Sequence, residues 1–381
     1  MIEQPEDVDV AIIGAGPLGM ALALALAGGP TVVLIDSRAR GAWADDPRAL
    51  ALAHGSRQLL ERLGAWHAAA ATAIREIHVS QRGGFGRTRI DADDCQVPAL
   101  GYVMRYRDLA DALAARLPPQ GLIAPCSVDS IEVGKERTTL MLTHNGARRR
   151  LRARLIVHAD GMPEAGPEVK VRDYAQQAIV AEVRTSQPHK HRAWERFTAD
   201  GPLALLPLGE NYAVVFTVPT DKAAPLLALD DDGFLAALRA QFGKRVGFVA
   251  SGPRASFPLA LRVRRQITQP RQVWIGNSAQ TLHPVSGQGF NLGLRDAWQL
   301  AAALLDAADP GAPATLAGYA RGRQIDRRGS VAFTDGLVRI FSNDLPPFRV
   351  VRGLGLLALD LCPPLRHFVA KRMIWGARAW P

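Results

Sequence analysis

The sequence predicts an α/β fold with an inserted β-rich lobe and a helical C-terminal tail. Three observations carry this prediction. An apolar run at residues 8–13 leads into a glycine-rich turn and then a helical pattern, and a second apolar run at 273–275 does the same. Between about 170 and 265 the pattern changes to short runs of strand type. A chain of 381 residues is also long enough to build two lobes around separate cores.

The first glycine-rich turn has the spacing G-x-G-x-x-G, with Gly14, Gly16 and Gly19 lying between a strand and a helix. A second strand follows at 31–35, and Asp36 stands at its end, about twenty residues past the motif. Gly14 permits the tight turn, Gly16 lets the backbone approach a pyrophosphate, and Gly19 lets the helix pack on the strand. The helix N-terminus stabilises the phosphate charge, and Asp36 would accept hydrogen bonds from a ribose. The sequence therefore predicts a Rossmann-like dinucleotide-binding unit, whose motif fits NAD and FAD equally.

A second glycine-rich loop lies in residues 276–296, far along the chain from the first. It joins the apolar run at 273–275 to an Ala/Leu-rich helix and contains Pro284, Gly287 and Gly289. Backbone N–H groups in such a loop can approach a flat or anionic ligand. Two loops of this kind on one chain suggest that both ends of one long cofactor are held.

The remaining elements follow in order along the chain. A helix is expected at 54–63, where the leucines have helical spacing, and a strand pair in 76–100 around a glycine-rich turn. We expect a helix at 108–117 and short strands in 122–158. The expected elements of the insertion are strands at 178–183, 203–206 and 213–218 and one helix at 233–242.

These patterns predict a division of the chain into three parts. A discontinuous cofactor-binding domain comprises residues 1–75, 101–165 and 268–335. Residues 76–100 and 166–267 form a substrate domain, which contains no cofactor motif of its own. Residues 336–381 form a C-terminal helical segment.

The net charge of +10 indicates attraction to an anionic partner, either nucleic acid or an anionic membrane surface. The densest basic run lies at 148–154, where Arg150, Arg152 and Arg154 alternate with apolar residues just before a strand. We interpret this run as a solvated sheet edge, because no aromatic platform or zinc-finger spacing accompanies it. The sequence therefore predicts no nucleic-acid partner.

Cysteine usage and the first residues bear on location. Cys95, Cys126 and Cys362 are far apart and odd in number, which fits a reducing compartment better than disulfides or a metal site. The acidic start at 1–7 is unlike a basic targeting segment, and no uninterrupted apolar stretch reaches the ~18–20 residues that span a bilayer. We therefore expect a cytoplasmic protein without a metal site.

Taken together, the motifs resemble the group A flavoprotein aromatic hydroxylases over nearly the whole chain. Within that family they are most similar to the ubiquinone-biosynthesis hydroxylases of the 2-polyprenyl-6-methoxyphenol type. Four segments carry the resemblance: the 14–19 motif with Asp36, the D-x-R-x-x-A-L-like segment at 46–52, Asp160-Gly161, and the 276–296 loop in place of the family's usual G-D-A-A-H. The segment at 195–207 also looks like this subgroup's substrate lobe.

The resemblance implies a p-hydroxybenzoate-hydroxylase-like fold with FAD as cofactor and NAD(P)H as reductant. It also places the turn at 287–290 beside the isoalloxazine ring and gives catalytic roles to His283, Pro284 and Gln288. The implied cofactor contacts are Gly14, Gly16, Gly19, Asp36, Arg48, Arg107, Asp160, Gly161, Asn277, Gly287, Gly289, Phe290 and Asn291.

The resemblance further implies a function. The chain would be an FAD-dependent monooxygenase that hydroxylates the aromatic ring of a polyprenyl phenol in ubiquinone biosynthesis, by way of a flavin C4a-hydroperoxide. The phenol and O₂ would be its small-molecule partners, and other ubiquinone-biosynthesis proteins its protein partners. The protein's own task would be to hold the ring over the flavin and exclude water.

Several alternatives stay open at this point. Asn277 stands where most of the family has aspartate, and residues 162–167 form a shortened, proline-broken loop. Both features leave room for a non-catalytic or weakly FAD-binding assembly subunit of a ubiquinone-biosynthesis complex. Another flavin enzyme is a further alternative, although the W-x-W-x-I-P signature of halogenases is absent. His283 is either the general base for the phenol or a loop residue that orients the turn at Pro284.

The C-terminal tail at 346–381 mixes apolar residues with arginines and lysines. A basic amphipathic segment suits the surface of a membrane, where a polyprenyl phenol resides. The same composition suits a helical cap packed on the FAD domain. The first interpretation places the protein peripherally on the inner face of the membrane.

Overall fold

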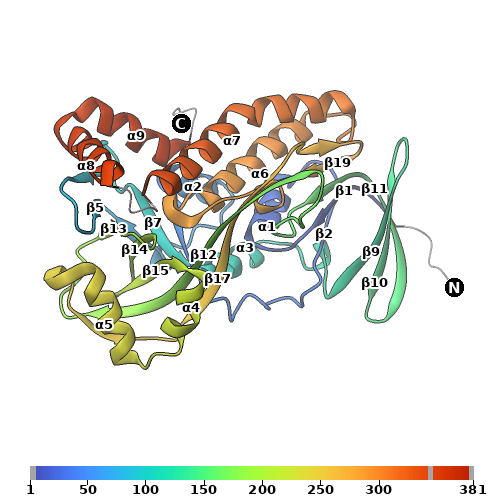
Figure 1. Ribbon diagram of the computed structural model, residues 1–381. Coiled ribbons are helices and arrows are strands. Elements are labelled where there is room, and N and C mark those ends of the chain that lie inside the picture. Colours follow the sequence, from blue (N-terminus) through green and yellow to red (C-terminus); the bar gives the residue numbers. More distant parts are fainter. Residues whose placement is uncertain (1–5, 342–345, 377–381) are drawn as a thin grey trace.

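The computed structural model describes residues 6–341 and 346–376 (Figure 1). In this part of the chain two large sheets are joined by a three-stranded sheet and covered by helices. Helices α6 and α7 lie side by side along the top of the molecule in Figure 1. The predicted α/β class is confirmed, and the division into domains stays a prediction.

The first sheet contains the N-terminal βαβ unit. Strand β1 lies between β2 and β11 and runs parallel to both, and β19 extends the sheet beyond β11. Residues 10–13 of β1 are all apolar because helices α1 and α6 cover one face and the β9–β10 hairpin covers the other. The strands of this sheet are β1 Glu6–Ile13, β2 Val32–Ile35, β8 Leu122–Ile123, β9 Cys126–Val133, β10 Thr138–His144, β11 Ala147–His158, β18 Thr268–Gln269 and β19 Gln272–Trp274.

The second sheet contains the predicted insertion strands together with the predicted pair at 76–100. Helices α4 Thr220–Leu227 and α5 Asp231–Phe242 cover its outer face around Phe216 and Phe234. Its inner face is turned toward the helices and loops of the first unit. The strands of this sheet are β5 Glu76–Gln81, β6 Arg87–Asp91, β12 Val169–Thr185, β13 Arg192–Phe197, β14 Pro202–Leu208, β15 Asn211–Pro219, β16 Phe248–Ser251, β17 Ala255–Arg264 and β20 Gln280–Thr281.

The remaining elements connect the two sheets. The three-stranded sheet consists of β3 Ala49–Ala53, β4 Thr72–Ile74 and β7 Gly101–Arg105. The α-helices not yet given are α1 Pro17–Ala25, α2 His54–Arg62, α3 Tyr106–Ala114, α6 Gly289–Leu305, α7 Pro313–Phe341, α8 Pro346–Leu361 and α9 Pro363–Trp375. Short 3₁₀ turns are η1 Ala68–Ala70, η2 Pro119–Gly121, η3 Gly243–Arg245, η4 Gly276–Ser278 and η5 Pro284–Ser286.

One expectation is wrong. The basic run at 148–154 is not simply a sheet edge, because residues 151–153 pair with β1 on one side and with β10 on the other. Arg152 and Arg154 extend from this interior strand to Asp7 and Asp9, with nearest N–O distances of 2.7 Å and 3.4 Å. Alternation correctly indicated a partly solvated face. It carries no information about whether a strand has one neighbour or two.

Candidate functional site

Four of the predicted motifs follow the carboxyl ends of neighbouring parallel strands. The 14–19 turn follows β1, Asp36 follows β2, Asp160 follows β11, and η4 follows β19 shortly after Trp274. Ligands of open α/β sheets bind outside this edge. Segments far apart in sequence are thus brought to one edge of one sheet.

Close backbone packing shows why glycine occupies the turns. Gly14 has a φ of +106°, and a Cβ built there would lie 2.5 Å from the Ala159 carbonyl oxygen. A Cβ at Gly276 would collide with the Leu18 side chain of the first motif, and one at Gly293 would be in tight contact with it. The two glycine-rich loops therefore contact each other directly, as expected if they enclose one ligand.

The N-terminus of α1 suits a pyrophosphate. Gly16 is its N-cap residue without a side-chain hydrogen bond, Pro17 opens the helix, and the first turn holds no acidic residue. Asp36 accepts a 2.8 Å hydrogen bond from the Ala15 N–H, which fixes its carboxylate beside the turn. This cradle would be filled by any side chain at Gly14, and it fits the adenosine diphosphate part of FAD.

Arg48 and Arg107, both predicted cofactor contacts, have different surroundings. Arg48 is paired with Asp46, and its guanidinium lies 4.6 Å from the Tyr106 ring centroid and 5.6 Å from that of Phe257. Phe257 belongs to the second sheet, so Arg48 lies where the two units meet. Arg107 is half exposed on α3 and has only a long ion pair of 3.8 Å with Asp108. Arg48 nevertheless lies at the start of α3, because its carbonyl accepts the Tyr106 N–H at 2.9 Å.

The loop after β19 is anchored by a buried charged network. The Asp296 carboxylate on α6 accepts hydrogen bonds from the Gly276 N–H at 3.0 Å and from Gln280 Nε2 at 2.7 Å. Arg323 on α7 is fully buried and donates to the other Asp296 oxygen at 2.6 Å. Arg323 also pairs with Asp326 at 2.9 Å. This network holds the cofactor loop against both long helices, and sequence patterns gave no sign of Arg323.

Asn291 uses its whole side-chain amide within the protein. Its Oδ1 accepts from the Ala53 N–H and the Ser56 hydroxyl, and its Nδ2 donates to the carbonyls of Ala51 and Gly287. These bonds fix the 287–291 turn to β3. Only the backbone of Asn291 is left to meet a cofactor, in the first turn of α6, where helix N–H groups lack intrahelical partners.

His283 lies under the turn of η5. Its Nδ1 accepts the Val285 N–H at 3.1 Å, and burial lowers the pKa of the imidazole to about 4. The ring is therefore neutral near pH 7, and it holds the turn that begins at Pro284. This geometry supports the orienting role among the two alternatives, and the role itself stays a prediction.

The other predicted residues line the same edge. The Gln288 amide donates to the Met373 carbonyl of α9 at 3.1 Å, which ties the 287–290 turn, predicted to lie on the flavin side, to the C-terminal helix. Ser278 donates to Asp160 at 3.0 Å and accepts from the Gly161 N–H. Asn277 is exposed beside this pair, and Phe290 is partly buried against the first core.

Glu195 is a candidate that motif reasoning missed. It lies on β13 between Ala193 and Phe197, which point into the interior from the same side of the strand. Its Oε1 is buried without a hydrogen-bond partner, and burial raises the pKa of the carboxyl to about 8. An acidic residue at the inward position of an alternating strand is the sequence signal that was available.

The fold and these loops define an FAD-binding protein, and comparison with known proteins agrees. The family model for the FAD binding domain matches residues 7–332, so the chain belongs to that family. Relatives that match it include proteins named as hydroxylases and monooxygenases, and the chain is an FAD-dependent monooxygenase. The predicted cofactor is thereby confirmed.

Two relatives match nearly end to end. The chain is 35% identical to the ubiquinone hydroxylase UbiL of Rhodospirillum rubrum, covering 98% of this chain and 91% of the relative. It is 32% identical to the 3-demethoxyubiquinol 3-hydroxylase of Escherichia coli, covering 97% and 99%. The solved structure of p-nitrophenol 4-monooxygenase PnpA from Pseudomonas putida superposes with a TM-score of 0.78 at 16% identity, over 97% of this chain and 99% of that one. This last likeness shows the fold alone.

Proposed function

We propose that the protein hydroxylates the aromatic ring of a polyprenyl phenol in ubiquinone biosynthesis, with NAD(P)H as reductant and O₂ as co-substrate. The observation that carries this proposal is the meeting of the two glycine-rich loops at Leu18, beside the inner face of the second sheet. The printed activities of the two end-to-end relatives support the substrate class.

The proposed division of labour follows the geometry. Bound FAD supplies the redox chemistry that activates O₂. The α1 N-terminus would hold the pyrophosphate and Asp36 the ribose. The N–H groups of Gly289 and Phe290 would face the flavin ring, because they open helix α6 and need partners. The inner face of the second sheet would hold the phenol and exclude water.

The assembly-subunit alternative gains no support from the two departures that raised it. Asn277 is exposed to solvent, so an amide in place of aspartate leaves no buried group without a hydrogen-bond partner. The loop at 162–167 is tied to the second sheet, because Arg262 donates to the Pro163 carbonyl at 2.7 Å and Arg265 to the Pro167 carbonyl at 3.0 Å. These two hydrogen bonds hold the shortened loop in place at this edge of the site.

A direct experiment uses the purified protein with FAD, NADPH and a prenylated 2-methoxyphenol under ¹⁸O₂. The proposal expects flavin absorbance, NADPH oxidation stimulated by the phenol, and a product carrying one ¹⁸O atom. NADPH oxidation that yields only peroxide with every prenylated phenol tested would refute the substrate assignment.

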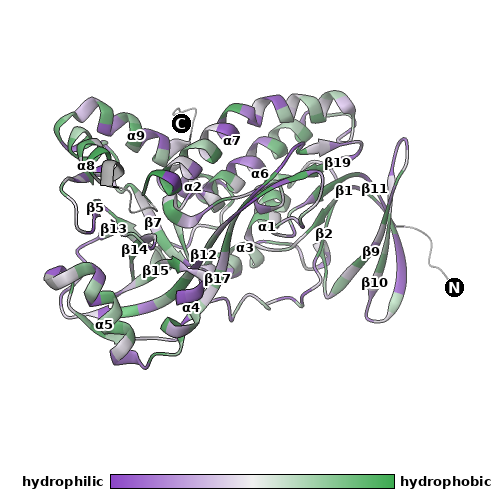
Figure 2. Cartoon of the chain, in the orientation of Figure 1, coloured by the Kyte–Doolittle hydropathy of each residue, from purple (hydrophilic) through white to green (hydrophobic). Residues whose placement is uncertain are grey.

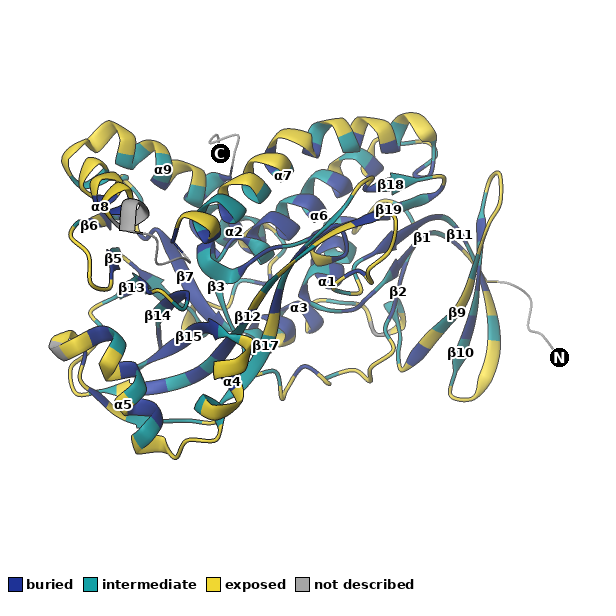
Figure 3. Cartoon of the chain, in the orientation of Figure 1, coloured by how far each residue is buried: buried dark blue, intermediate teal, exposed yellow. Residues whose placement is uncertain are grey.

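We also propose that the protein works at an anionic phospholipid surface, in the cytoplasm. Every exposed residue that the structure describes between 350 and 361 of α8 is apolar, including Val351, Leu354 and Leu361 (Figures 2 and 3). Contiguous exposed apolar surface marks an interaction site. Helix α9 instead packs as a cap, with Ala370 and Ile374 buried. In the described residues, no helix has the length and apolar character to cross a bilayer.

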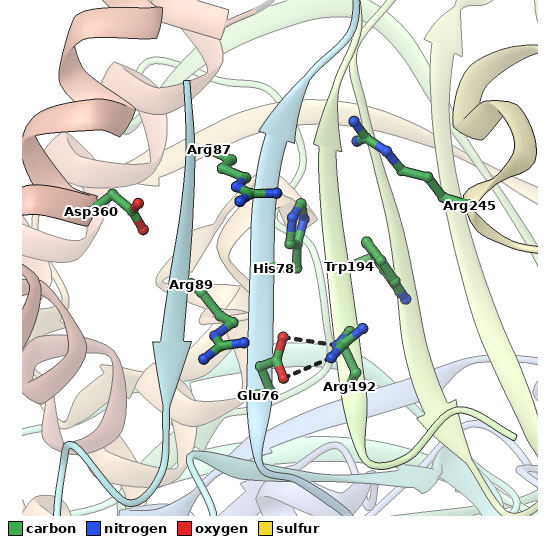
Figure 4. Close-up of a pocket in the computed structure, with 8 residues that line it drawn as sticks. All are labelled: Glu76, His78, Arg87, Arg89, Arg192, Trp194, Arg245 and Asp360. Atoms are coloured by element: carbon green, nitrogen blue, oxygen red, sulfur yellow. Dashed lines mark hydrogen bonds and ion pairs between the residues drawn. The ribbon is translucent and has the colours of Figure 1, made fainter. Parts of the chain in front are cut away.

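Charge for such a contact comes from the second sheet as well as from the exposed Lys371 and Arg372 of α9. Arg352 is buried, and Arg366 is bound to Asp94. Beside α8, however, Arg87, Arg89 and Arg245 have no partner among the described residues. They lie in a trough of about 540 Å³, with Asp360 on the α8 side and the Glu76–Arg192 pair on its floor (Figure 4).

Vesicle flotation of the full chain tests this contact. Recovery with vesicles that contain anionic phospholipid should exceed recovery with neutral vesicles, and Leu354→Glu with Leu361→Glu should abolish it. Equal recovery of this double variant would refute the lipid contact, and so would binding of a purified ubiquinone-biosynthesis protein through this face without any lipid binding.

A further inference from the structure

Glu195 is placed on the face of the second sheet that looks toward the flavin-side turn. Its strand neighbour Phe197 stacks on Phe341 of α7 with ring centroids 3.8 Å apart. Val285 of η5 packs against the same cluster. Because side chains two residues apart in a strand lie on one face, the Glu195 carboxyl points toward the region between this cluster and the cofactor loop.

The surroundings of Glu195 offer it no protein partner. On the flanking strands its register neighbours are Val79 and Ala204, and both are apolar. Arg196, the next residue along the strand, points to the opposite face and donates to the Gln241 carbonyl. No hydrogen bond or ion pair joins the Glu195 side chain to any residue that the structure describes, and its Oε1 is inaccessible to solvent.

An isolated interior carboxyl group is costly unless something binds it. Leaving a polar group buried and unpaired destabilises a fold. Glu195 nevertheless keeps a partly accessible surface although Oε1 is sealed. The side chain is thus partly accessible on the face of β13 whose neighbours Val79 and Phe197 pack with Val285 of η5.

We propose that the Glu195 carboxylate accepts a hydrogen bond from the substrate's phenol hydroxyl and takes its proton. The inference rests on the proposed function, since it assumes that a phenol binds on this face of the second sheet. The O–H bond of the phenol breaks and an O–H bond forms on the carboxylate, with no change in oxidation state. The ring keeps the electron pair, which makes its carbon atoms more electron-rich and more reactive toward an electrophilic oxygen.

The alternative base in this neighbourhood is His283, and pH separates the two. The pKa of His283 is held near 4 and that of Glu195 near 8. If Glu195 accepts the proton, kcat/KM for a phenol should rise with pH and level off above about 8. If His283 did so, the rise would be complete near pH 5.

The experiment compares holoenzyme kcat/KM from pH 6 to 9.5 for the wild type, Glu195→Gln and Glu195→Leu. The substrates are a prenylated 2-methoxyphenol and its O-methyl ether, whose binding is also followed through the flavin spectrum. We expect the wild type to have a higher kcat/KM for the phenol than for the ether. Its kcat/KM for the phenol should rise with pH and level off above about 8, and this rise is the limb that Glu195 would produce. Both variants should lose the limb and about tenfold or more of kcat/KM for the phenol, the cost of one strong hydrogen bond.

Controls distinguish the possible failures. Glu132→Gln removes an exposed carboxylate on β9 and should behave as the wild type. A limb near 8 that persists in Glu195→Gln, at unchanged FAD content, would overturn the role of Glu195 while leaving the proposed function intact. If the wild type oxidises and binds neither compound, the proposed function fails and this inference fails with it.

Discussion

Two buried carboxyl groups in this protein have opposite surroundings. Asp296, between α6 and α7, accepts hydrogen bonds from the Gly276 N–H, from Gln280 and from Arg323. Glu195, on the inner face of the second sheet, has no partner within the described chain. Both groups are acidic and interior, so burial alone cannot explain the difference.

The difference separates interior charged groups that stabilise the fold from those that are available to a ligand. Both Asp296 oxygens accept hydrogen bonds from protein groups without any added molecule, and these bonds fix the loop that would hold FAD. Glu195 is incomplete without one, because its carboxyl group faces apolar neighbours. The cofactor side of the protein is thus pre-organised, while the substrate side keeps one polar group for the molecule that arrives.

Breaking the Asp296–Arg323 network should change the free energy of unfolding more than the other substitutions considered. Arg323→Met leaves Asp296 buried without its ion-pair partner, while Asp326 keeps its pair with Arg295, and this should lower the free energy of unfolding by about 3–5 kcal/mol. Urea denaturation at pH 7.5 measures this, and flavin release should begin at lower urea than in the wild type. Arg339→Met, which removes an exposed ion pair to Asp335, is the matched control and should change stability by less than about 1 kcal/mol. Equal losses in the two variants would show that Asp296 needs no cation.

Removing the unpaired Glu195 carboxyl group should raise the free energy of unfolding, whereas Arg323→Met lowers it. The pKa of Glu195 is raised from 4.5 to about 8 in the fold, so between these values the unfolded state ionises and the native state does not. The wild type therefore loses stability as pH rises through this window. Glu195→Gln should unfold at higher urea than the wild type at pH 7.5, by about 2–4 kcal/mol, and the gain should vanish near pH 4.5. A gain that does not vary with pH would contradict the account.

The smallest expected effect belongs to His283. Its pKa is lowered from 6.5 to about 4, so the unfolded state takes up a proton that the native state refuses as pH falls below 6.5. Stability contributed by the neutral ring is present above pH 6.5 and is lost toward pH 4. His283→Asn can keep the bond to the Val285 N–H and should exceed the wild type at pH 5 by about 1–2 kcal/mol, with little difference at pH 7.5. Urea unfolding at both pH values measures this, and a deficit at pH 5 would show that the imidazole does more than cap the turn.

Sequence patterns predicted the cofactor side well, for a local reason. Gly14, Gly16 and Asp36 form a contiguous strand–turn–helix–strand signal, and backbone geometry alone dictates glycine at the turn. The 276–296 loop was predicted in the same way, from its glycines and the strand and helix around it, and the structure brings it into contact with Leu18. The family and the cofactor follow from these segments, and the comparisons confirm both.

The remaining features depend on contacts that no local pattern encodes. Arg323 on α7 pairs with Asp296 on α6. The apolar surroundings of Glu195 include Val79, which lies far away in sequence. The interior position of residues 151–153 follows from pairing with both β1 and β10, which alternation cannot show. Asn291 was predicted beside the cofactor, but its side chain proved to be bound by four protein groups.

The most direct test of the account is a crystal structure of the holoenzyme with FAD and a prenylated 2-methoxyphenol. The account predicts FAD between the N-termini of α1 and α6, with the phenol oxygen within about 2.6–3.2 Å of the Glu195 carboxyl group. A phenol bound elsewhere, or a Glu195 carboxyl group paired with a protein side chain in that complex, would contradict it.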